Sequence, residues 1–259
     1  MADFPFTSRP RKRPGHFFVA LTLTLAAFTA PAAAARLSFC LDKANPLFPI
    51  DRAVATAVAQ ADHAAPRFVV IDTRDGSDTL DARKPAFFAK LATRCDLVMG
   101  FPVEAGDPTL PRGVKATLAY AATGFVLANI GTKALSFAGL PAKTRVGVAY
   151  LTVPTTYFGT GHGAALTEYQ YSSPASLYRA LASHKINAAL IWQPWLERHL
   201  AAASAKIAQH QPNLPHARWD IVALYRSAAS AEAVRFNSAI GRLGPRHLAA
   251  LIAPYRLPQ

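Results

Sequence analysis

The sequence predicts an α/β fold built from two strand–helix–strand units of mostly parallel sheet. Short apolar runs of strand length alternate with longer alanine-rich or amphipathic segments of helical length. The first half has the order strand, helix, strand, helix, strand. The second half has a further strand–helix–strand unit before the chain ends in helices. Because right-handed crossovers join parallel strands, each half is expected to form a sheet flanked by helices.

The elements of the first half follow from apolar runs and turn residues. Leu97–Met99 is apolar, too short for a helix, and followed by the turn-like Gly100-Phe101-Pro102. Pro85 suits the first turn of a helix. Asp51 is expected near the start of an alanine-rich helix, after the loop Asp42–Ile50 with its breaking prolines. The predicted elements are the strands Arg36–Leu41, Arg67–Asp72 and Leu97–Met99 and the helices Asp51–Asp62 and Pro85–Leu91.

The second half is interpreted with the same signals. Ser173 is expected to cap a strongly amphipathic helix that has Pro174 at its first position. Gly124 interrupts one strand-like run, and Ser230 is expected to cap the first of two closing helices. The predicted strands are Ala121–Ala128, Lys143–Tyr150, Ala188–Trp192 and Asp220–Leu224. The predicted helices are Ser173–His184, Pro194–Ala203, Ser230–Leu243 and Arg246–Ile252.

The chain begins with the features of an export signal. Four basic residues between Arg9 and Arg13 precede the mostly apolar, uncharged segment His16–Ala30, and the alanines up to Ala35 offer a cleavage site. The apolar segment is shorter than the ~20 residues of a spanning helix, so removal rather than anchoring is expected. Cleavage near Ala35 would place the mature protein in the periplasm.

The protein is strongly basic. Its 28 lysines and arginines against 15 aspartates and glutamates give a net charge of +13. This charge suits an acidic partner, an anionic ligand or a membrane surface, and it is equally consistent with a basic surface that has no specific partner. Scattered basic residues and export argue against nucleic acid as a partner. The length suits a monomer with one domain or two modest lobes.

Cys40 and Cys95 are the two cysteines. In an oxidising compartment an isolated pair is expected to form a disulfide. Both lie at or near the starts of predicted strands, and the first and third strands are neighbours in a sheet of order 2-1-3. The alternative is a catalytic thiol, but there is no Cys-x-x-Cys motif and nothing marks either thiolate as activated.

Some side chains near predicted strand ends suit ligand binding, and each has an ordinary structural alternative. Thr155 and Thr156 are expected at a helix start, where hydroxyls and free backbone N–H groups suit an anion; the alternative is a plain N-cap. Trp192 and Gln193 offer an aromatic wall and an amide, or else pack in the core. Arg74 suits a carboxylate, although a solvated arginine is the simpler interpretation.

No catalytic or cofactor motif emerges. The loop Gly159–Gly163 lacks both the Lys-Ser/Thr of a P-loop and the spacing of a dinucleotide fingerprint, so it is interpreted as a flexible loop. The histidines do not form a metal-binding pair, and no Gly-x-Ser-x-Gly motif occurs. A protein without enzymatic activity, metal or cofactor is expected.

Several segments carry a resemblance in their order and spacing: Leu37–Phe48, Cys95–Pro102, Ala121–Ala128, Arg145–Thr156, Ile186–Trp195 and Tyr255–Pro258. Together they resemble type II periplasmic solute-binding proteins of extracellular solute-binding family 3. The closest resemblance is to the binding-protein-like partners of periplasmic quinoprotein dehydrogenases. Those proteins share the cysteine of the first strand, a Cys-Asp-Val-Val-Met-Gly-type third strand, the tryptophan-proline segment and the Tyr-x-x-Pro ending.

The resemblance implies two lobes joined by crossover strands near Ala122–Val126 and Trp219–Ala223, with a ligand bound in a cleft that closes by hinge motion. Lobe 1 would comprise residues 36–121 and 224–259, and lobe 2 residues 122–223. Together with the side chains considered above, the implied ligand contacts are Asp42, Phe48, Arg74, Gly100, Phe101, Thr123, Thr155, Thr156, Trp192 and Gln193.

The chain departs from the family pattern in ways that argue against ordinary amino-acid binding. Arg112 only loosely matches the usual carboxylate-clamping arginine, and Asn187 replaces the usual aspartate. The expected function is capture of a small polar or anionic solute for an ABC transporter. The alternative is an accessory protein of a periplasmic quinoprotein (PQQ) dehydrogenase system, with the same fold and a degenerate cleft.

Overall fold

The computed structural model describes residues 36–72, 91–106, 109–159, 161, 163–200, 206–255 and 257–258. The predicted export signal, Arg74 and most of the predicted helix Pro85–Leu91 lie outside these residues. In the described part of the chain, no helix combines the length and apolar character needed to cross a membrane.

Strands and helices alternate along most of the described chain. The strands are β1 (Arg36–Asp42), β2 (Ala65–Ile71), β3 (Leu97–Glu104), β4 (Lys115–Ala116), β5 (Ala121–Ile130), β6 (Arg145–Ala149), β7 (Thr167–Tyr171), β8 (Ala188–Trp192), β9 (Ile207–His210) and β10 (Arg218–Tyr225). The α-helices are α1 (Phe48–Ala61), α3 (Pro154–Gly159), α4 (Pro174–Ala182), α5 (Gln193–Leu200) and α6 (Ser230–Leu251). Short 3-10 turns are η1 (Phe137–Gly139), η2 (Ser227–Ala229) and η3 (Ala253–Tyr255).

The strands form the order β2-β1-β3-β10-β5-β8-β6-β7, with β4 paired to β10 and β9 paired to β5. Strands β1, β2 and β3 are mutually parallel, and so are β6, β7 and β8. All the antiparallel pairs in the described residues involve β5 or β10. The predicted α/β class and the predicted order 2-1-3 are confirmed.

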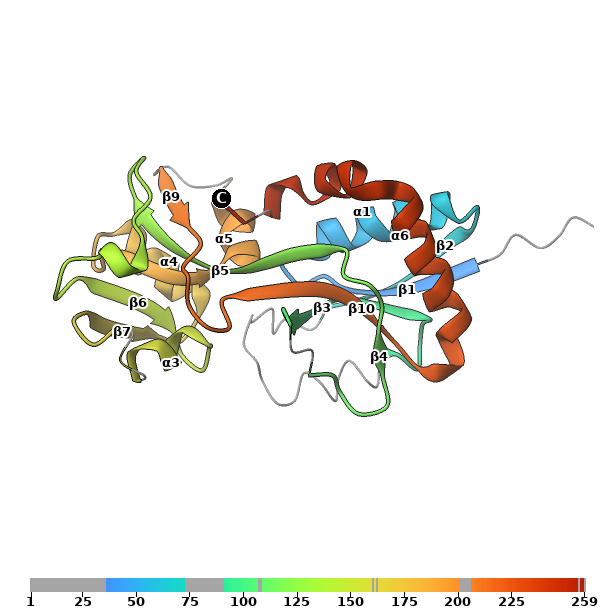
Figure 1. Cartoon of the computed structure of the whole chain (residues 1–259), viewed down its shortest axis with the longest axis horizontal. Coiled ribbons are helices and arrows are strands. Elements are labelled where there is room, and N and C mark those ends of the chain that lie inside the picture. Colours follow the sequence, from blue (N-terminus) through green and yellow to red (C-terminus); the bar gives the residue numbers. More distant parts are fainter. Residues whose placement is uncertain are drawn as a thin grey trace, which may run out of the picture. The chain divides into compact units, whose positions relative to one another are not determined.

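Strands β5 and β10 are the two crossover strands, and Figure 1 shows them running side by side between the two parallel sets. The start of β5, Ala121–Gly124, pairs with β10, whereas Phe125–Asn129 pairs with β8. Gly124 lies at this change of partner, where an added Cβ would be 2.0 Å from the carbonyl oxygen of Ala217. Glycine therefore permits the close backbone approach that the exchange of partners requires.

Side-chain alternation along β1 divides the neighbouring core. Leu37, Phe39 and Leu41 are buried in the main apolar cluster, together with the inner faces of α1 and α6. Cys40 lies in a second cluster, which also contains Phe101 of β3. This period of two is that of a strand buried on both faces, as parallel strands covered by helices usually are.

One predicted helix start and one predicted helix cap are wrong. Helix α1 begins at Phe48 rather than Asp51, because Pro49 occupies its first turn instead of ending the loop. Ser230 is the first residue of α6 and not its cap, since the cap position is Ala229 and the Ser230 hydroxyl donates to the carbonyl of Ser227. By contrast, Ser173 caps α4 as predicted, in a reciprocal capping box with Ser176.

Other differences concern element length and polar strands. Strand β3 continues to Glu104 because its second half pairs with β10. Strands β7 and β9 were not predicted; both are short, and neither is a buried apolar run. By contrast, the two predicted closing helices are confirmed, because non-helical backbone at Gly244 (φ +71°), beside Pro245, divides α6 into two helices where the break was expected.

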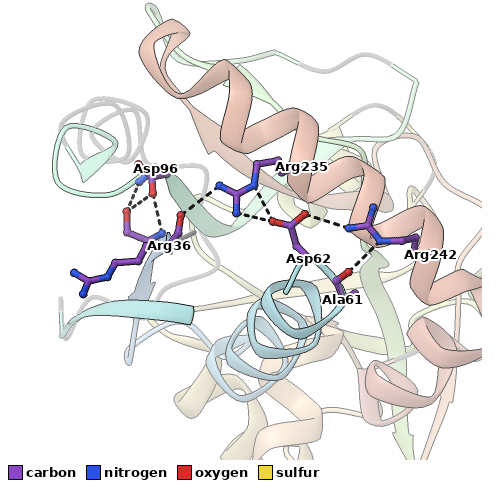
Figure 2. Close-up of polar contacts among 7 residues, drawn as sticks. Arg36, Ala61, Asp62, Asp96, Arg235 and Arg242 are labelled. Carbon is purple, nitrogen blue, oxygen red and sulfur yellow. Dashed lines mark hydrogen bonds and ion pairs between the residues drawn. The ribbon is translucent and has the colours of Figure 1, made fainter. Parts of the chain in front are cut away.

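An ion-pair cluster fixes the end of α1 against α6. Asp62, just after α1, accepts hydrogen bonds from Arg235 at 2.8 Å and from Arg242 at 3.2 Å (Figure 2). The two arginines also donate to the carbonyl oxygens of Arg36 and Ala61. One carboxylate is thus shared by two guanidinium groups, so each arginine has an ion-pair partner within the fold, although the cluster keeps a net positive charge.

Cys40 and Cys95 form the predicted disulfide, with their Cα atoms 5.7 Å apart. Cys40 is in β1 and Cys95 lies two residues before β3, so the bond joins two strands that are also hydrogen-bonded neighbours. The 55 residues of sequence separation form a long closed loop, whose entropy in the unfolded chain is thereby reduced.

Replacing both cysteines by serine should lower the free energy of unfolding by about 2–4 kcal/mol, measured by guanidinium denaturation. Wild-type protein treated with dithiothreitol is the control and should reach the same midpoint. An unchanged midpoint in both samples would contradict a stabilising bond between Cys40 and Cys95.

Candidate functional site

The carboxyl ends of β1 and β8 converge at helix α5. Trp192, the last residue of β8, pairs with Phe125 of β5, so α5 begins beside a crossover strand. Farther along α5, Nη1 of Arg198 donates to the carbonyl oxygens of Lys43 and Asn45, each at 3.4 Å, in the loop after β1. Helix α5 thus joins strand ends of both parallel sets, which is where open α/β sheets bind ligands.

The residues that are linked by these contacts, and by those described below, are called the junction site. Its members are Asp42, Asn45, Asp51, Gly100, Tyr120, Thr123, Trp192, Gln193, Arg198 and Tyr255.

Two predicted contact residues meet directly at this site. Thr123 of β5 and Gln193 of α5 are buried, and the Thr123 hydroxyl donates to Oε1 of Gln193 at 3.0 Å. The ring of Trp192 lies edge-on to Phe125, at 5.2 Å between centroids, and to Trp219 at 6.4 Å. The aromatic wall and the amide therefore have partners within the protein, and their contact with a ligand stays a prediction.

Gly100 lies at a bulge in β3. The register between β3 and β10 shifts between Val222 and Leu224, and Gly100 has φ +80°. A Cβ at this position would lie 2.3 Å from Oδ2 of Asp51 and 2.6 Å from Nδ2 of Asn45. Glycine is therefore required both by the backbone conformation and by the two polar side chains packed against it.

Side chains satisfy both backbone groups of Gly100. Its N–H donates to the Tyr120 hydroxyl at 2.7 Å, and that hydroxyl donates to Oδ1 of Asp51 at 2.6 Å. Its carbonyl accepts from Nδ2 of Asn45 at 3.0 Å. Strand β3, helix α1 and the segment before β5 are thereby held together by one buried polar network.

The buried carboxyl of Asp51 has a strongly perturbed pKa. Its pKa is raised from 3.8 to about 7, chiefly by burial and to a smaller extent by the charge of Asp42, while the hydrogen bond from Tyr120 opposes the rise. Burial also raises the pKa of Tyr255, an effect that Arg198 opposes and Asp51 reinforces. Tyr255, from the C-terminal Tyr-x-x-Pro segment, therefore lies within electrostatic range of both α5 and α1.

Sequence reasoning missed the centre of this network. Asp51 was interpreted as a residue of a helix start, and neither Tyr120 nor Arg198 was singled out. Asp51 and Tyr120 are 69 residues apart, and Arg198 is 153 residues from Asn45, so no local pattern marks these pairs. A usable signal is a carboxylate in the first turn of an otherwise apolar, alanine-rich helix.

The remaining predicted residues near β1 and β3 have structural contacts. Oδ1 of Asp42 accepts from the backbone N–H of Ala44 at 2.9 Å and shapes the loop after β1. Phe48 begins α1 and packs against the main core. Phe101 is buried in the disulfide-containing cluster, away from the network around Gly100.

Thr155 and Thr156 lie in the first turn of the short helix α3, as expected from the sequence. The N–H and the hydroxyl of Thr155 both donate to the carbonyl of Thr152, at 3.1 and 2.7 Å. Those of Thr156 donate in the same way to Val153. These donors are engaged within the turn, so their availability to an anion stays a prediction.

The other sequence candidates lie elsewhere. Arg112 is exposed in the segment before β4. Asn187 accepts hydrogen bonds from the N–H and Nε of Arg145, at the start of β6. Arg74 lies outside the described residues, as do two residues of the loop Gly159–Gly163.

The described groups suit non-covalent recognition. Amides, hydroxyls, carboxylates, aromatic rings and one guanidinium supply hydrogen bonds and apolar contact. Nowhere in the described part of the chain do three or more His, Cys, Asp or Glu side chains gather in a way that could hold a metal ion.

No family model matches the chain, and no curated protein matches it in sequence. Solved structures do match. Substrate binding domain 2 of GlnP from Lactococcus lactis, in an open conformation, has a TM-score of 0.65 at 15% identity, covering 88% of this chain and 97% of that one. The chain has the fold of a type II periplasmic binding domain.

Two further similar structures extend this result. MxaJ from Methlophaga aminisulfidivorans MPT has a TM-score of 0.57 at 17% identity, covering 85% of this chain and 98% of that one. The periplasmic binding protein XoxJ from Methylobacterium extorquens AM1 has a TM-score of 0.56 at 16% identity, covering 86% and 98%. At such identities the likeness shows the fold alone, and it confirms the predicted fold class.

Gly100→Ala should lower the free energy of unfolding by about 3 kcal/mol or more, because the new methyl group combines backbone strain with a clash against Asp51. Gly113→Ala is the matched control. Gly113 has φ +83° with no atom within 4 Å of an added Cβ, so this variant carries the backbone strain alone. Its expected loss is about 1 kcal/mol, by urea denaturation. Equal losses would show that Asp51 does not crowd Gly100.

Asp51→Asn should change how stability depends on pH. Between pH 4 and pH 7 the unfolded chain ionises Asp51 while the folded protein keeps it neutral, so wild-type stability falls as pH rises through this window. The variant lacks this contribution, and its stability relative to wild type should rise by about 2–4 kcal/mol from the acidic to the alkaline side.

Urea denaturation at several pH values on both sides of this window would measure the effect of Asp51→Asn. If the stability of Asp51→Asn runs parallel to that of wild type across the window, the Asp51 carboxyl does not have the raised pKa.

Proposed function

We propose that the protein is a periplasmic solute-binding protein that holds a small polar or anionic solute between its two lobes and acts with an ABC transporter. The observation that carries the proposal is the convergence at the junction site. Gln193 meets Thr123 on a crossover strand, and Arg198 of the same helix reaches the loop after β1. Side chains from both parallel sets would thus respond to one ligand.

Hinge motion at β5 and β10 would couple binding to lobe closure. The lobe boundaries, residues 36–121 with 224–259 against 122–223, belong to the same proposal. So does the periplasmic location, which rests on the export signal expected from the sequence and on the fold shared with periplasmic binding proteins.

A second candidate is an accessory protein of a periplasmic quinoprotein dehydrogenase system. The observation that favours it is that polar groups of the junction site bond to one another, as Thr123 does with Gln193 and Tyr120 with both Gly100 and Asp51. Polar groups that already bond to one another within the protein leave fewer donors and acceptors for a solute. The sequence resemblance to dehydrogenase-associated proteins points in the same direction.

A thermal-shift screen of the mature protein against amino acids, organic acids, polyamines and products of alcohol oxidation tests the first candidate. A ligand at a hundredfold excess over its Kd stabilises the fold by ~2.7 kcal/mol, which raises Tm by roughly 5–10 °C in a chain of this size. Gln193→Ala should weaken binding about tenfold or more. Arg226→Ala, at an exposed residue after β10, should bind as wild type does.

Absence of any shift in a folded, monodisperse sample would reject solute binding for these compound classes. Co-sedimentation with a purified quinoprotein dehydrogenase of the same organism then decides the second candidate. A stable complex supports the accessory role, and sedimentation as separate species rejects it.

A further inference from the structure

One end of the second parallel set gathers basic side chains. At this end β5 stops at Ile130, while β6, β8 and β9 begin, because Asn129 pairs with Ala188, Val146 pairs with Ala188, and Ile130 pairs with Ile207. At these strand ends lie four lysines, one arginine and one histidine, here called the basic edge, whose charge is that of its lysines and arginine: Lys133, Lys143, Arg145, His184, Lys185 and Lys206.

Backbone contacts hold these residues at one end of the sheet. The buried Asn129 donates to the carbonyl of Lys133 at 3.0 Å, which folds the loop after β5 onto the strand end. The N–H of Gly131 donates to the carbonyl of Lys206 at 2.9 Å. Nη2 of Arg145 donates to the carbonyl of His184 at 3.3 Å. The cluster is therefore a property of the fold rather than of one flexible segment.

The positive charge of the basic edge is not neutralised within the described chain. All six residues are exposed, and none of them forms an ion pair with a described carboxylate. In the described strand ends and connections that form the edge, Glu168 of β7 is the one acidic residue, and it accepts a hydrogen bond from Gln170. The arginines around Asp62 differ, because there two cations share a carboxylate (Figure 2).

We propose that the basic edge docks an acidic face of a partner protein. Unpaired cations on ordered loops present a fixed positive potential, which speeds association with a complementary acidic surface and sets its orientation. The edge lies at the amino ends of β6 and β8, whereas the junction site lies at the carboxyl end of β8. Docking there leaves the junction site free, so the proposal is independent of the solute.

A protein fits this edge better than a lipid surface does. Peripheral membrane binding combines cations with apolar side chains that enter the interface. The large apolar side chains that are exposed in the described residues lie outside the segments that carry the six basic residues. They are Val70, Leu118, Tyr150, Leu151, Tyr169 and Val234.

The test compares two charge-reversal variants of the mature protein with equal net charge. The edge variant is Lys133→Glu, Lys143→Glu and Lys185→Glu. The control variant is Arg67→Glu, Arg94→Glu and Arg226→Glu, at exposed residues away from this edge. All six substitutions are at exposed side chains, and an unchanged Tm and circular dichroism spectrum would establish that both variants are folded.

Binding to fluorescently labelled poly-L-glutamate is measured by anisotropy at about 50 mM NaCl and again at about 150 mM. The edge variant should lose about tenfold or more in affinity, and the control variant less than about threefold. Wild-type binding should weaken at the higher salt concentration. Equal losses in the two variants, or no loss in the edge variant, would overturn the proposal.

Vesicles of phosphatidylcholine with phosphatidylglycerol provide the second arm. If the edge variant loses vesicle binding but keeps its affinity for poly-L-glutamate, the edge recognises lipid and the proposal is wrong. Loss of poly-L-glutamate binding with little vesicle binding by wild type supports a protein partner.

Discussion

Strands β5 and β10 are hydrogen-bonded to each other through Ala121–Gly124, and each also pairs with one of the parallel sets. This pairing constrains the residues where β5 changes partner and the movement of the two parallel sets. At Gly124 the backbone approaches Ala217 so closely that no side chain fits. The next residue, Phe125, pairs with Trp192 of β8, and the two rings pack edge-on. The exchange of partners takes place within one strand, so any relative movement of the parallel sets must strain or rotate these few residues.

Much of the fold could be predicted because its buried strands are apolar. Leu97–Met99 and Ala188–Trp192 are short apolar runs of the kind that buried strands contain. The order of the first three strands predicted the 2-1-3 sheet, which supported the disulfide expected of an isolated cysteine pair. Strand β7, Thr167–Tyr171, escaped prediction because its residues are polar and mostly exposed at the sheet edge. Edge strands are defined by their neighbour, here β6, rather than by their own composition.

The site was only partly predictable for a related reason. Thr123 and Gln193 were each proposed, and the fold brings them into contact. Tyr120 and Arg198 act through contacts with distant backbone groups, which leave no trace in local sequence. The donors of Thr155 and Thr156 form hydrogen bonds within the turn that begins α3, a use that the sequence did not indicate, and their role toward an anion stays a prediction.

Burial of the Asp51 carboxyl at this site is unfavourable for stability. A buried carboxylate is unfavourable in water-poor surroundings, and the single hydrogen bond from Tyr120 does not restore its ordinary pKa. An apolar residue at this position would avoid that cost, but it would leave the Tyr120 hydroxyl without its acceptor and would remove the carboxyl that packs against Gly100. Perturbed carboxyls of this kind are common where a protein binds something.

The two ends of the second parallel set differ in electrostatic character: one has buried polar groups and the other has exposed basic side chains. At the carboxyl end of β8, polar groups are buried and bonded to one another, so any ligand must compete with contacts the protein already makes. At the amino ends of β6 and β8, cations are exposed and unpaired by described carboxylates. Exposed charge contributes little to folding, whereas it raises the rate and specificity of association. The arrangement therefore separates a buried polar site, where the proposed solute would bind, from an exposed basic surface, where the proposed partner would dock.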